Sequence, residues 1–463
     1  MKSNKLTSFE KDHTIAAIAT PTGHGGVGVI RLSGPHTQSI AVGLIGHLPK
    51  PRYAEYVSFL AADGISIDKG LVIYFPSPHS FTGEDILELQ GHGGPIILDC
   101  LLQRVLQLGA CLARPGEFSE RAFLNGKIDL IQAEAIADLI AAESEQAARA
   151  AVRSLQGEFS NHIKEMVETL IVLRVYLEAS LDFSDEPVDF LQDMEIDKKL
   201  NLILLKIRKI KEAARQGTLL REGIHVAIVG PPNAGKSSLL NKLTGQDSAI
   251  VTSVSGTTRD VIREKIYIDG LPIHIVDTAG LRRTENEIEQ EGIKRSLAEI
   301  EKADRILYVV DSANVPMDDL EALHQLEFFK RLTIDKRLTV IRNKVDVSEE
   351  NASLIRKVDF DIISLSVKTG EGLAILHNYL KTSVGYYDIG IQNNFSARRR
   401  HLEALNNAEL ALNDSLQKLI GYKFPELLAE DLAVAQRYLN EITGEFTSED
   451  LLGKIFSSFC IGK

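Results

Sequence analysis

The residues best suited to chemistry in this chain form a glycine-rich run, Gly230–Ser237, which reads G-P-P-N-A-G-K-S. An apolar segment, residues 224–229, precedes it, and a helix-like segment, residues 238–243, follows. A phosphate-binding loop requires this order of strand, loop and helix, because its glycines let backbone N–H groups turn toward a phosphate. Lys236 would supply positive charge to the β- and γ-phosphates, and the Ser237 hydroxyl would bind Mg²⁺. The alternative is a chance match in a glycine-rich loop.

Four further motifs follow the loop in the order and at the spacing of a GTP-binding domain. They are Gly256–Asp260, Asp277–Gly280, Asn343–Asp346 and Ser366–Lys368. A threonine of the first motif can close over the γ-phosphate and bind Mg²⁺, and the second motif can bind a Mg²⁺-bound water and sense the γ-phosphate. The carboxylate of Asp346 can accept from guanine N1–H and the 2-amino group, a donor pair that adenine lacks. Each motif is weak alone, but together they predict a GTP site.

Hydrolysis at this site needs an unusual arrangement. Ras-like enzymes orient the attacking water with a glutamine directly after D-x-x-G, but Leu281 stands there and cannot hydrogen-bond a water. The next residues carry four carboxylates, Glu285, Glu287, Glu289 and Glu291. One of the four can orient the water while the others belong to a solvated loop, and the pattern does not say which.

Asn233 is the second unusual residue of the nucleotide loop. An amide oxygen at this position can coordinate a monovalent cation beside the phosphates. Such a cation would neutralise charge between the β- and γ-phosphates, as an arginine finger does. The alternative is a side chain that only stabilises the loop.

Length and composition predict a multidomain globular protein of the cytoplasm. The chain has 463 residues, which suits two to four domains, and no apolar run approaches the roughly 18 residues of a membrane span. The N-terminus has no signal core, and three scattered cysteines argue against a disulfide framework or a zinc site. A net charge of −12 argues against nonspecific nucleic-acid binding. Residues 398–401, R-R-R-H, are either a local basic patch or a solvated helix face.

The pattern of apolar runs divides the chain into regions and predicts a multidomain α/β protein. Residues 1–125 alternate short strands with helices and predict a compact α+β domain. Residues 126–218 and 384–463 are helical, and residues 219–383 hold a Ras-like P-loop G domain. We therefore expect one helical domain into which the G domain is inserted, because insertion is tolerated where chain ends lie close together.

A set of motifs spread along the chain is more specific than the G-domain signatures that many GTPases share. They include the D-T-A-G-L-R run of Asp277–Arg282, within the G domain, and the F-C-I-G-K tail of Phe459–Lys463 at the C-terminal end. In the N-terminal region they are Thr14–Pro21, Arg31–Gly34, Phe81–Asp85, Leu89–Gly94, Arg114–Ser119 and Ala122–Lys127. With Asn233 in the P-loop, these motifs resemble the MnmE (TrmE) family of tRNA-modification GTPases along essentially the whole chain.

The resemblance implies a GTP-hydrolysing enzyme that modifies the wobble uridine (position 34) of certain tRNAs. With a FAD-dependent partner, MnmG (GidA), in a heterotetramer, it would add an aminomethyl or carboxymethylaminomethyl group at C5. The one-carbon unit would come from a tetrahydrofolate derivative, the 5-formyl or 5,10-methylene form, held by the N-terminal domain. The N-terminal domains would form a homodimer, and the G domains would dimerise in a K⁺-dependent way that activates hydrolysis.

The resemblance also implies roles for individual residues. The K⁺ site would be formed by Asn233, Thr252, Val254 and Thr257, and the Mg²⁺ site by Ser237 and Thr258. Glu289 would orient the attacking water and act in catalysis with Lys236. The predicted GTP contacts are Asn233, Ala234, Gly235, Lys236, Ser237, Ser238, Thr252, Ser253, Val254, Ser255, Gly256, Thr257, Thr258, Asp277, Thr278, Ala279, Gly280, Asn343, Lys344, Asp346, Ser366, Val367 and Lys368.

Folate binding is implied for four residues, Arg31, Glu88, Lys127 and Lys463. The cations suit the glutamate-tail carboxylates of a folate, and Glu88 suits pterin N–H groups, although Glu88 also fits a structural role in an alternating strand. Cys460 in the tail is a candidate nucleophile toward the pyrimidine ring, and the alternative is a small, partly buried thiol.

Two other functions compete with this one. A ribosome-assembly GTPase would share the G domain but do no chemistry on RNA, and it usually carries a basic RNA-binding module or a second P-loop, neither of which this sequence contains. A folate-binding aminomethyltransferase relative with a regulatory GTPase overlaps the first function.

Overall fold

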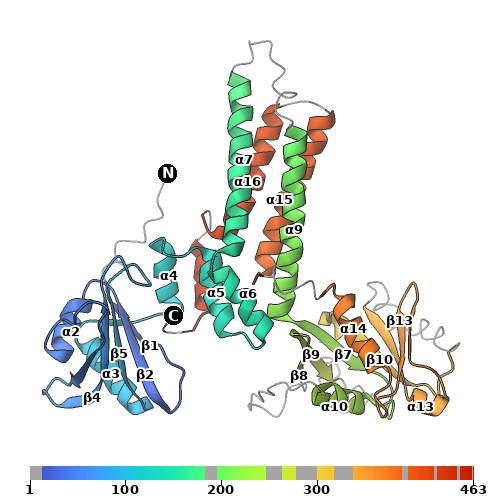
Figure 1. Ribbon diagram of the computed structural model, residues 1–463, viewed down its shortest axis with the longest axis horizontal. Coiled ribbons are helices and arrows are strands. Elements are labelled where there is room, and N and C mark those ends of the chain that lie inside the picture. Colours follow the sequence, from blue (N-terminus) through green and yellow to red (C-terminus); the bar gives the residue numbers. More distant parts are fainter. Residues whose placement is uncertain are drawn as a thin grey trace, which may run out of the picture. The chain divides into compact units, whose positions relative to one another are not determined.

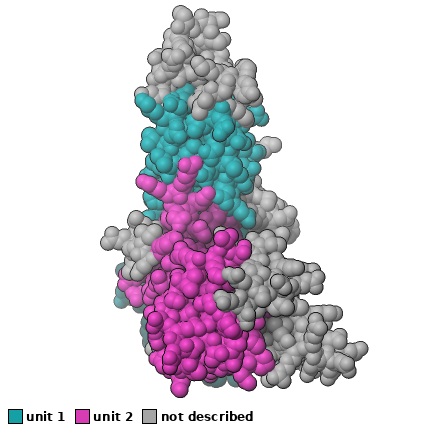
Figure 2. All heavy atoms as spheres, turned by 90° about the vertical axis from the view of Figure 1, so that its right-hand side faces the viewer, with its two compact units in different colours: residues 1–141, 152–207, 403–463 teal, residues 142–151, 208–402 magenta. Residues whose placement is uncertain are grey.

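The computed structural model describes residues 13–182, 196–246, 263–277, 300–317, 337–387, 395–421, 425–445, 449–460 and 462. The chain forms two compact units, which Figure 2 shows in teal and magenta. One unit contains residues 1–141, 152–207 and 403–463, and the other contains residues 142–151 and 208–402. Each unit contains one of the two sheets.

The first unit contains a six-stranded sheet in the order β3-β4-β5-β2-β1-β6 (Figure 1). Its strands are β1 (Ile15–Ile18), β2 (Gly25–Ser33), β3 (Glu55–Leu60), β4 (Ser66–Phe75), β5 (Ile86–Gly93) and β6 (Cys111–Leu112). The sheet packs on two helices, α2 (Thr37–Ile45) and α3 (Pro95–Gln107), through a core that includes Ile30, Leu32 and Leu89. Strand alternation sends Arg31, between two core residues, to the opposite face.

That opposite face has a smaller apolar cluster around α4 (Glu117–Leu124). Ile15 and Ala17 of β1 pack there with Ala113 and with Phe118 of α4. The predicted α+β character of the N-terminal region is confirmed. The sheet therefore has one face closed by helices and another that is closed only in part.

Long helices make up the rest of the first unit and extend into the second. They are α5 (Leu130–Ile140), α6 (Glu145–Leu155), α7 (Glu158–Asp182), α9 (Ile196–Glu222), α15 (Arg399–Gly421), α16 (Pro425–Thr443) and α17 (Glu449–Ser457). α5 begins at a capping box in which Asp129 and Gln132 each satisfy the other's backbone N–H. α7 runs beside α16 although the two are far apart in sequence (Figure 1), and Arg174 Nη1 donates to Gln436 Oε1 at 2.7 Å.

The second unit contains a seven-stranded sheet in the order β12-β13-β11-β10-β7-β9-β8. Its strands are β7 (Ile224–Val229), β8 (Arg263–Ile268), β9 (Leu271–Asp277), β10 (Arg305–Asp311), β11 (Leu338–Asn343), β12 (Ser353–Arg356) and β13 (Asp361–Leu365). The pairs that join β9, β7, β10, β11 and β13 are parallel, and the two edge strands β8 and β12 are antiparallel to their neighbours. Helices α10 (Lys236–Gln246), α13 (Val345–Ser348) and α14 (Leu373–Ser383) belong to this unit.

The strand predicted over residues 224–229 is confirmed as β7, with the predicted limits. A near-continuous apolar run predicts such a strand because a parallel strand in the middle of a sheet is buried on both faces. The mixed α/β character of the chain is confirmed as well. Among the described helices, none is both long and apolar enough to cross a membrane.

Candidate functional site

Three of the predicted nucleotide motifs, the P-loop, Asn343–Asp346 and Ser366–Lys368, lie at the carboxyl ends of neighbouring strands of the seven-stranded sheet. Val229 at the end of β7 is opposite Tyr308 of β10, and Asp311 at the end of β10 is opposite Asn343 of β11. Asn343 is in turn opposite Leu365, the last residue of β13. The loops that follow these carboxyl ends therefore meet, at the type of edge where open α/β sheets bind ligands.

Two glycines of the P-loop are required by close backbone approach. Gly230 has φ +145°, and a Cβ there would lie 2.2 Å from the Val309 carbonyl of β10. Gly235 has φ +98°, and its Cβ would lie 2.2 Å from Asn343 Nδ2. Asn233 between them has φ +62°, in the left-handed region that asparagine tolerates better than most residues. The loop follows a path that larger residues would obstruct, which suits a phosphate cradle.

Lys236 and Ser237 lie at the start of α10, directly after the loop. The Lys236 ammonium donates to the carbonyls of Gly230 at 3.0 Å and Pro231 at 2.9 Å. This places a cation over the loop, beside the N-terminus of an eleven-residue helix. Ser237 and Asn233 are both exposed, so their oxygens can reach a hydrated cation. The arrangement can therefore bind an anion and a metal together.

Asn343 joins three of the predicted motifs. Its side-chain Nδ2 donates to the Ala234 carbonyl of the P-loop at 2.9 Å. Its Oδ1 accepts from the Val367 N–H at 3.1 Å. Because Asn343 is only 3% exposed, these bonds are protected from water. The residue ties the P-loop to both base-side loops, a role that its sequence motif alone did not predict.

The base-side carboxylate is held in place by a hydroxyl. Ser366 Oγ donates to Asp346 Oδ1 at 2.6 Å and accepts from the Thr369 N–H at 3.2 Å. Ser366 is completely buried, so this contact leaves little freedom to the Asp346 side chain. The second oxygen of Asp346 is the chemical group that guanine N1–H and 2-amino donors require.

Lys344 forms an ion pair with Asp311, a residue for which the sequence patterns predicted no role. Its ammonium lies 2.7 Å from Asp311 Oδ2, at the end of β10. Burial opposes ionisation of Asp311, but the Lys344 ammonium and the Ala313 N–H outweigh it and hold the pKa of Asp311 below its usual value. The signal for Asp311 is an acidic residue at the carboxyl end of a buried strand. Asp311 therefore keeps its negative charge beside Lys344.

Part of the predicted nucleotide site lies outside the described residues. This applies to Thr252, Ser253, Val254, Ser255, Gly256, Thr257, Thr258, Thr278, Ala279, Gly280, Leu281 and the four candidate carboxylates that include Glu289. Asp277 is the last residue of β9, opposite Ile228 of β7. Among the described residues, no group of three or more His, Cys, Asp or Glu side chains could hold a metal ion.

Two of the predicted folate residues meet on the open face of the six-stranded sheet. Arg31 of β2 is opposite Glu88 of β5, and their side chains form an ion pair of 2.7 Å. The Arg31 guanidinium lies 5.9 Å from the ring centroids of both Phe81 and Phe118. A partly exposed ion pair flanked by two aromatic rings offers charge, hydrogen bonds and flat apolar surface to a planar ring system. These groups fit a pterin.

The other predicted folate residues are placed differently. Lys127 Nζ donates to the Pro78 carbonyl, in the loop between β4 and β5, at 3.1 Å. The tail reaches the N-terminal domain within one chain, because the Gly116 N–H donates to the Cys460 carbonyl at 3.3 Å. Gly462 has φ +91°, and a Cβ there would lie 2.5 Å from the Ile18 carbonyl at the end of β1. Cys460 is exposed, and Lys463 is outside the described residues.

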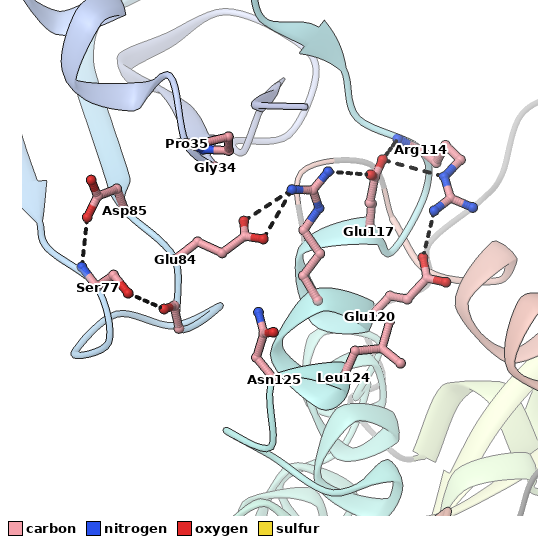
Figure 3. Close-up of a pocket in the computed structure, with 12 residues that line it drawn as sticks. Gly34, Pro35, Ser77, Glu84, Asp85, Arg114, Glu117, Glu120, Leu124 and Asn125 are labelled. Carbon is pink, nitrogen blue, oxygen red and sulfur yellow. Dashed lines mark hydrogen bonds and ion pairs between the residues drawn. The ribbon is translucent and has the colours of Figure 1, made fainter. Parts of the chain in front are cut away.

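A cavity of about 340 Å³ lies between α4 and the loops at the ends of β2 and β4. Figure 3 shows its lining residues, Gly34, Pro35, Ser77, Gly83, Glu84, Asp85, Arg114, Glu117, Glu120, Arg121, Leu124 and Asn125. The Arg121 side chain, 7% exposed, donates to Glu84 at 3.1 Å and to Glu117 at 3.0 Å. Glu84 and Glu117 belong to N-terminal motifs that carry the family resemblance, but Arg121 lies between two of those motifs, and no role was predicted for any of the three. The available signal was the acid–base spacing Glu117/Arg121, one helical turn apart.

The R-R-R-H segment at residues 398–401 forms part of the interior as well as the surface. Arg399 Nε donates to Glu222 Oε2 at 2.8 Å, and His401 is 1% exposed. The interpretation as a wholly solvated helix face is therefore wrong for His401. A fully exposed basic patch of four residues is excluded for the same reason.

The sheet order, the P-loop and the convergent base-side loops define a P-loop nucleotide-binding protein with a G-type domain. Residues 14–127 match the family model for the N-terminus of the GTP-binding protein TrmE, and residues 130–460 match the MnmE helical domain. The tRNA modification GTPase MnmE of Proteus mirabilis (strain HI4320) is 56% identical over 97% of this chain and 99% of its own length. The enzyme of that name from Pasteurella multocida (strain Pm70) is 54% identical over the same shares. The chain belongs to the MnmE family of tRNA modification GTPases.

The G domain of the T. maritima FeoB iron transporter is similar to part of this chain, with 25% identity over 34% of this chain and 97% of that chain and a TM-score of 0.25. The fold of the nucleotide-binding domain is defined by its own strand order and register.

Proposed function

We propose that this chain hydrolyses GTP and, with the FAD-dependent partner MnmG (GidA), modifies C5 of the wobble uridine (position 34) of certain tRNAs. The added group is aminomethyl or carboxymethylaminomethyl, and its one-carbon unit comes from 5-formyl- or 5,10-methylene-tetrahydrofolate. The observation that carries this proposal is the 56% identity, over 97% of the chain, to a relative named as a tRNA modification GTPase. The convergent nucleotide loops support the hydrolytic half of the proposal.

The GTP half of the proposal assigns the nucleotide to the edge where Asn343 joins the loops. Lys236 contacts the phosphates, Ser237 and Thr258 bind Mg²⁺, and Asp346 reads guanine. Asn233 binds K⁺ with Thr252, Val254 and Thr257, and Glu289 orients the attacking water in place of the glutamine that Leu281 replaces. The exposed, left-handed Asn233 supports the K⁺ assignment, since its amide is free to reach a cation beside the phosphates. Equal GTP turnover in K⁺ and Na⁺ at matched ionic strength would contradict it.

The folate half assigns the one-carbon donor to the open face of the six-stranded sheet. Arg31 and Glu88 contact the donor, and Lys127 and Lys463 bind its carboxylates. Cys460 is proposed as the nucleophile, and its exposure leaves the thiol accessible. The contact of the tail with Gly116 and Ile18 supports an arrangement in which Cys460 and the folate serve one reaction. Full modification of tRNA by a Cys460→Ser protein would remove the nucleophile assignment.

The assembly proposed for this function is cytoplasmic and oligomeric. Two chains form a homodimer through their N-terminal domains, and MnmG completes a heterotetramer that binds tRNA. Within each chain we propose domain limits at residues 1–125, 126–218, 219–383 and 384–463, with the G domain inserted in the helical domain. The packing of α7 against α16, from opposite sides of the G-domain segment in sequence, supports this insertion.

Mass spectrometry of tRNA wobble uridines tests the proposal directly. A strain that lacks this chain should lose the C5 group, and the intact chain should restore it. If the chain were a ribosome-assembly GTPase, the wobble uridines would carry the C5 group in both strains. The deletion strain would instead show a defect in its ribosomal subunits. Normal wobble uridines in the deletion strain would therefore refute the proposed function.

A further inference from the structure

Arg342 is a charged residue at a position where a buried strand normally carries an apolar one. It is the fifth residue of β11 and directly precedes Asn343. The residue is 1% exposed and has the largest of the fully buried charged side chains described. Burying a guanidinium is costly unless its N–H groups all find acceptors, so its presence requires an explanation.

The Arg342 guanidinium binds two separate segments. Nη1 donates to the Val315 carbonyl at 2.7 Å, and Nη2 is 3.4 Å from the Ser312 carbonyl, both in the loop after β10. On the other side, Nε donates to Glu350 Oε2 at 3.1 Å and Nη2 donates to Oε1 at 2.5 Å. Such a bidentate pair fixes orientation as well as distance, which a lysine ammonium cannot do.

The two segments that Arg342 joins carry the residues at the base side of the nucleotide site. The loop after β10 directly follows Asp311, the last residue of that strand and the partner of Lys344. The segment that ends near Glu350 contains α13, whose second residue is Asp346. A further bond of 2.9 Å between Ser312 Oγ and Ser348 Oγ joins the same two segments. Arg342 therefore links the loop after β10 to the segment that contains α13, and these two segments position Lys344 and Asp346.

We propose that Arg342 is a positioning residue for guanine recognition and that its pair with Glu350 sets the selectivity of Asp346. Arg342 contacts no nucleotide itself. It holds α13 at a fixed distance from the loop after β10, so that the Asp346 carboxylate keeps the position in which it accepts from two guanine donors at once. This inference deepens the proposed GTP site and rests on it.

The test compares GTP with ITP, which lacks the 2-amino group of guanine. The variants are Arg342→Met, which removes the guanidinium but keeps an unbranched side chain, and Glu350→Gln, which keeps the shape of the partner. Arg356→Met is the matched control, since Arg356 is an exposed residue of the edge strand β12, which does not pair with β11. Competition with a fluorescent GDP analogue gives both affinities for each full-length protein, and thermal unfolding reports its stability.

We expect the ratio of GTP to ITP affinity to fall about tenfold in Arg342→Met, because a displaced Asp346 loses its bond to the 2-amino group. We expect a fall of about threefold in Glu350→Gln, where the pair loses charge but keeps one hydrogen bond. The control should keep the wild-type ratio, and kcat at saturating GTP should stay near wild type in all three, since Arg342 touches no phosphate.

A folded Arg342→Met protein with the wild-type ratio would overturn the inference, even if its affinity for both nucleotides or its stability had fallen. If Arg342→Met does not fold, Glu350→Gln decides, because Glu350 is 31% exposed and the amide oxygen of the glutamine can still accept a hydrogen bond from the Arg342 guanidinium. An unchanged ratio in that variant then overturns the inference. A wild-type protein that does not prefer GTP to ITP would refute the proposed guanine site and this inference together, whereas a normal wild-type preference with unaffected variants refutes only this inference.

Discussion

The two sheets of this protein present their candidate functional residues in opposite ways. In the seven-stranded sheet those residues lie at or just after the carboxyl ends of parallel strands, as Asn343 and Ser366 do. In the six-stranded sheet they lie in the middle of strands, as Arg31 and Glu88 do, and face outward from a sheet whose other side is the core.

The difference shows how each kind of site is held together. At the nucleotide edge, side chains such as Asn343 and Lys236 bind backbone atoms of neighbouring loops, so the site depends on loop path. On the open face, Arg31 binds the side chain of Glu88 across a strand pair, so the site depends on register. A one-residue slip would send Arg31 into the core. We therefore expect the two sites to fail separately when they are altered.

Removal of the last four residues, Cys460–Lys463, is the strongest test of that separation. The deletion should abolish tRNA modification, because the tail contacts Gly116 and Ile18 of the N-terminal domain. GTP binding should be unchanged, since the nucleotide loops belong to a different compact unit. Wobble-uridine mass spectrometry and nucleotide titration measure the two outcomes. A truncated protein that modifies tRNA at the normal rate would remove the link between tail and chemistry.

Gly235→Ala tests the dependence of the nucleotide edge on loop path. A Cβ at Gly235 would collide with Asn343 Nδ2, so GTP affinity should fall by more than about 10²-fold. Gly370→Ala is the matched control, because Gly370 also has positive φ (+87°) but no atom lies within 4 Å of its Cβ position. The control should cost only about 1 kcal/mol of folding stability and leave affinity nearly unchanged. An equal loss of GTP affinity in both variants would show that backbone strain, and not the collision with Asn343, lowers the affinity.

Glu289→Ala separates GTP binding from GTP hydrolysis within the nucleotide site. The proposed role is to orient water in the transition state, so kcat should fall about 10²-fold while GTP affinity stays near wild type. Single-turnover hydrolysis and nucleotide titration separate the two effects. A large loss of GTP affinity would instead assign Glu289 a structural role.

Asp346→Asn changes the base that the edge accepts. An amide cannot accept from both guanine donors, so GTP affinity should fall by about tenfold or more. Affinity for XTP should rise, because the C2 oxygen of xanthine requires a donor. Titration with both nucleotides measures the exchange. Unchanged GTP binding would refute the base-reading role of Asn343–Asp346.

The smallest expected effect is a pH dependence that both sheets share. Burial opposes ionisation of Asp68, but the N–H and ring of His92 hold the pKa of Asp68 below its usual value, and the pKa of Asp311 is lowered too. Because the folded-state pKa is lowered, each carboxylate stabilises the folded protein at pH values above its unfolded pKa near 3.8. This stabilisation is lost as the pH falls through the folded-state pKa.

The measurement is the free energy of unfolding of wild type, Asp68→Asn and Asp311→Asn between pH 7 and pH 3. At pH 7 each variant should be less stable by about 1 kcal/mol, and the difference should shrink below pH 4. A difference that does not depend on pH would assign the loss to packing and not to charge.

Sequence patterns predicted the nucleotide edge better than the open face, and the reason is physical. The strand before the P-loop was predicted because motif and apolar run are contiguous in the chain. β10 was not singled out, because no nucleotide motif follows it, yet it supplies Asp311. The Arg31–Glu88 pair joins residues 57 positions apart, a contact that no local pattern contains.

The sequence by itself determined the family, the mixed α/β character and the order of the nucleotide motifs, because these depend on residue type and local spacing. Only the tertiary structure decided that Asn343 bridges the P-loop to Val367, that Arg342 braces the base-side loops, and that the tail lies against β1 within one chain. These contacts join segments distant in the chain, and strand register and helix packing decide which distant side chains come within hydrogen-bonding distance.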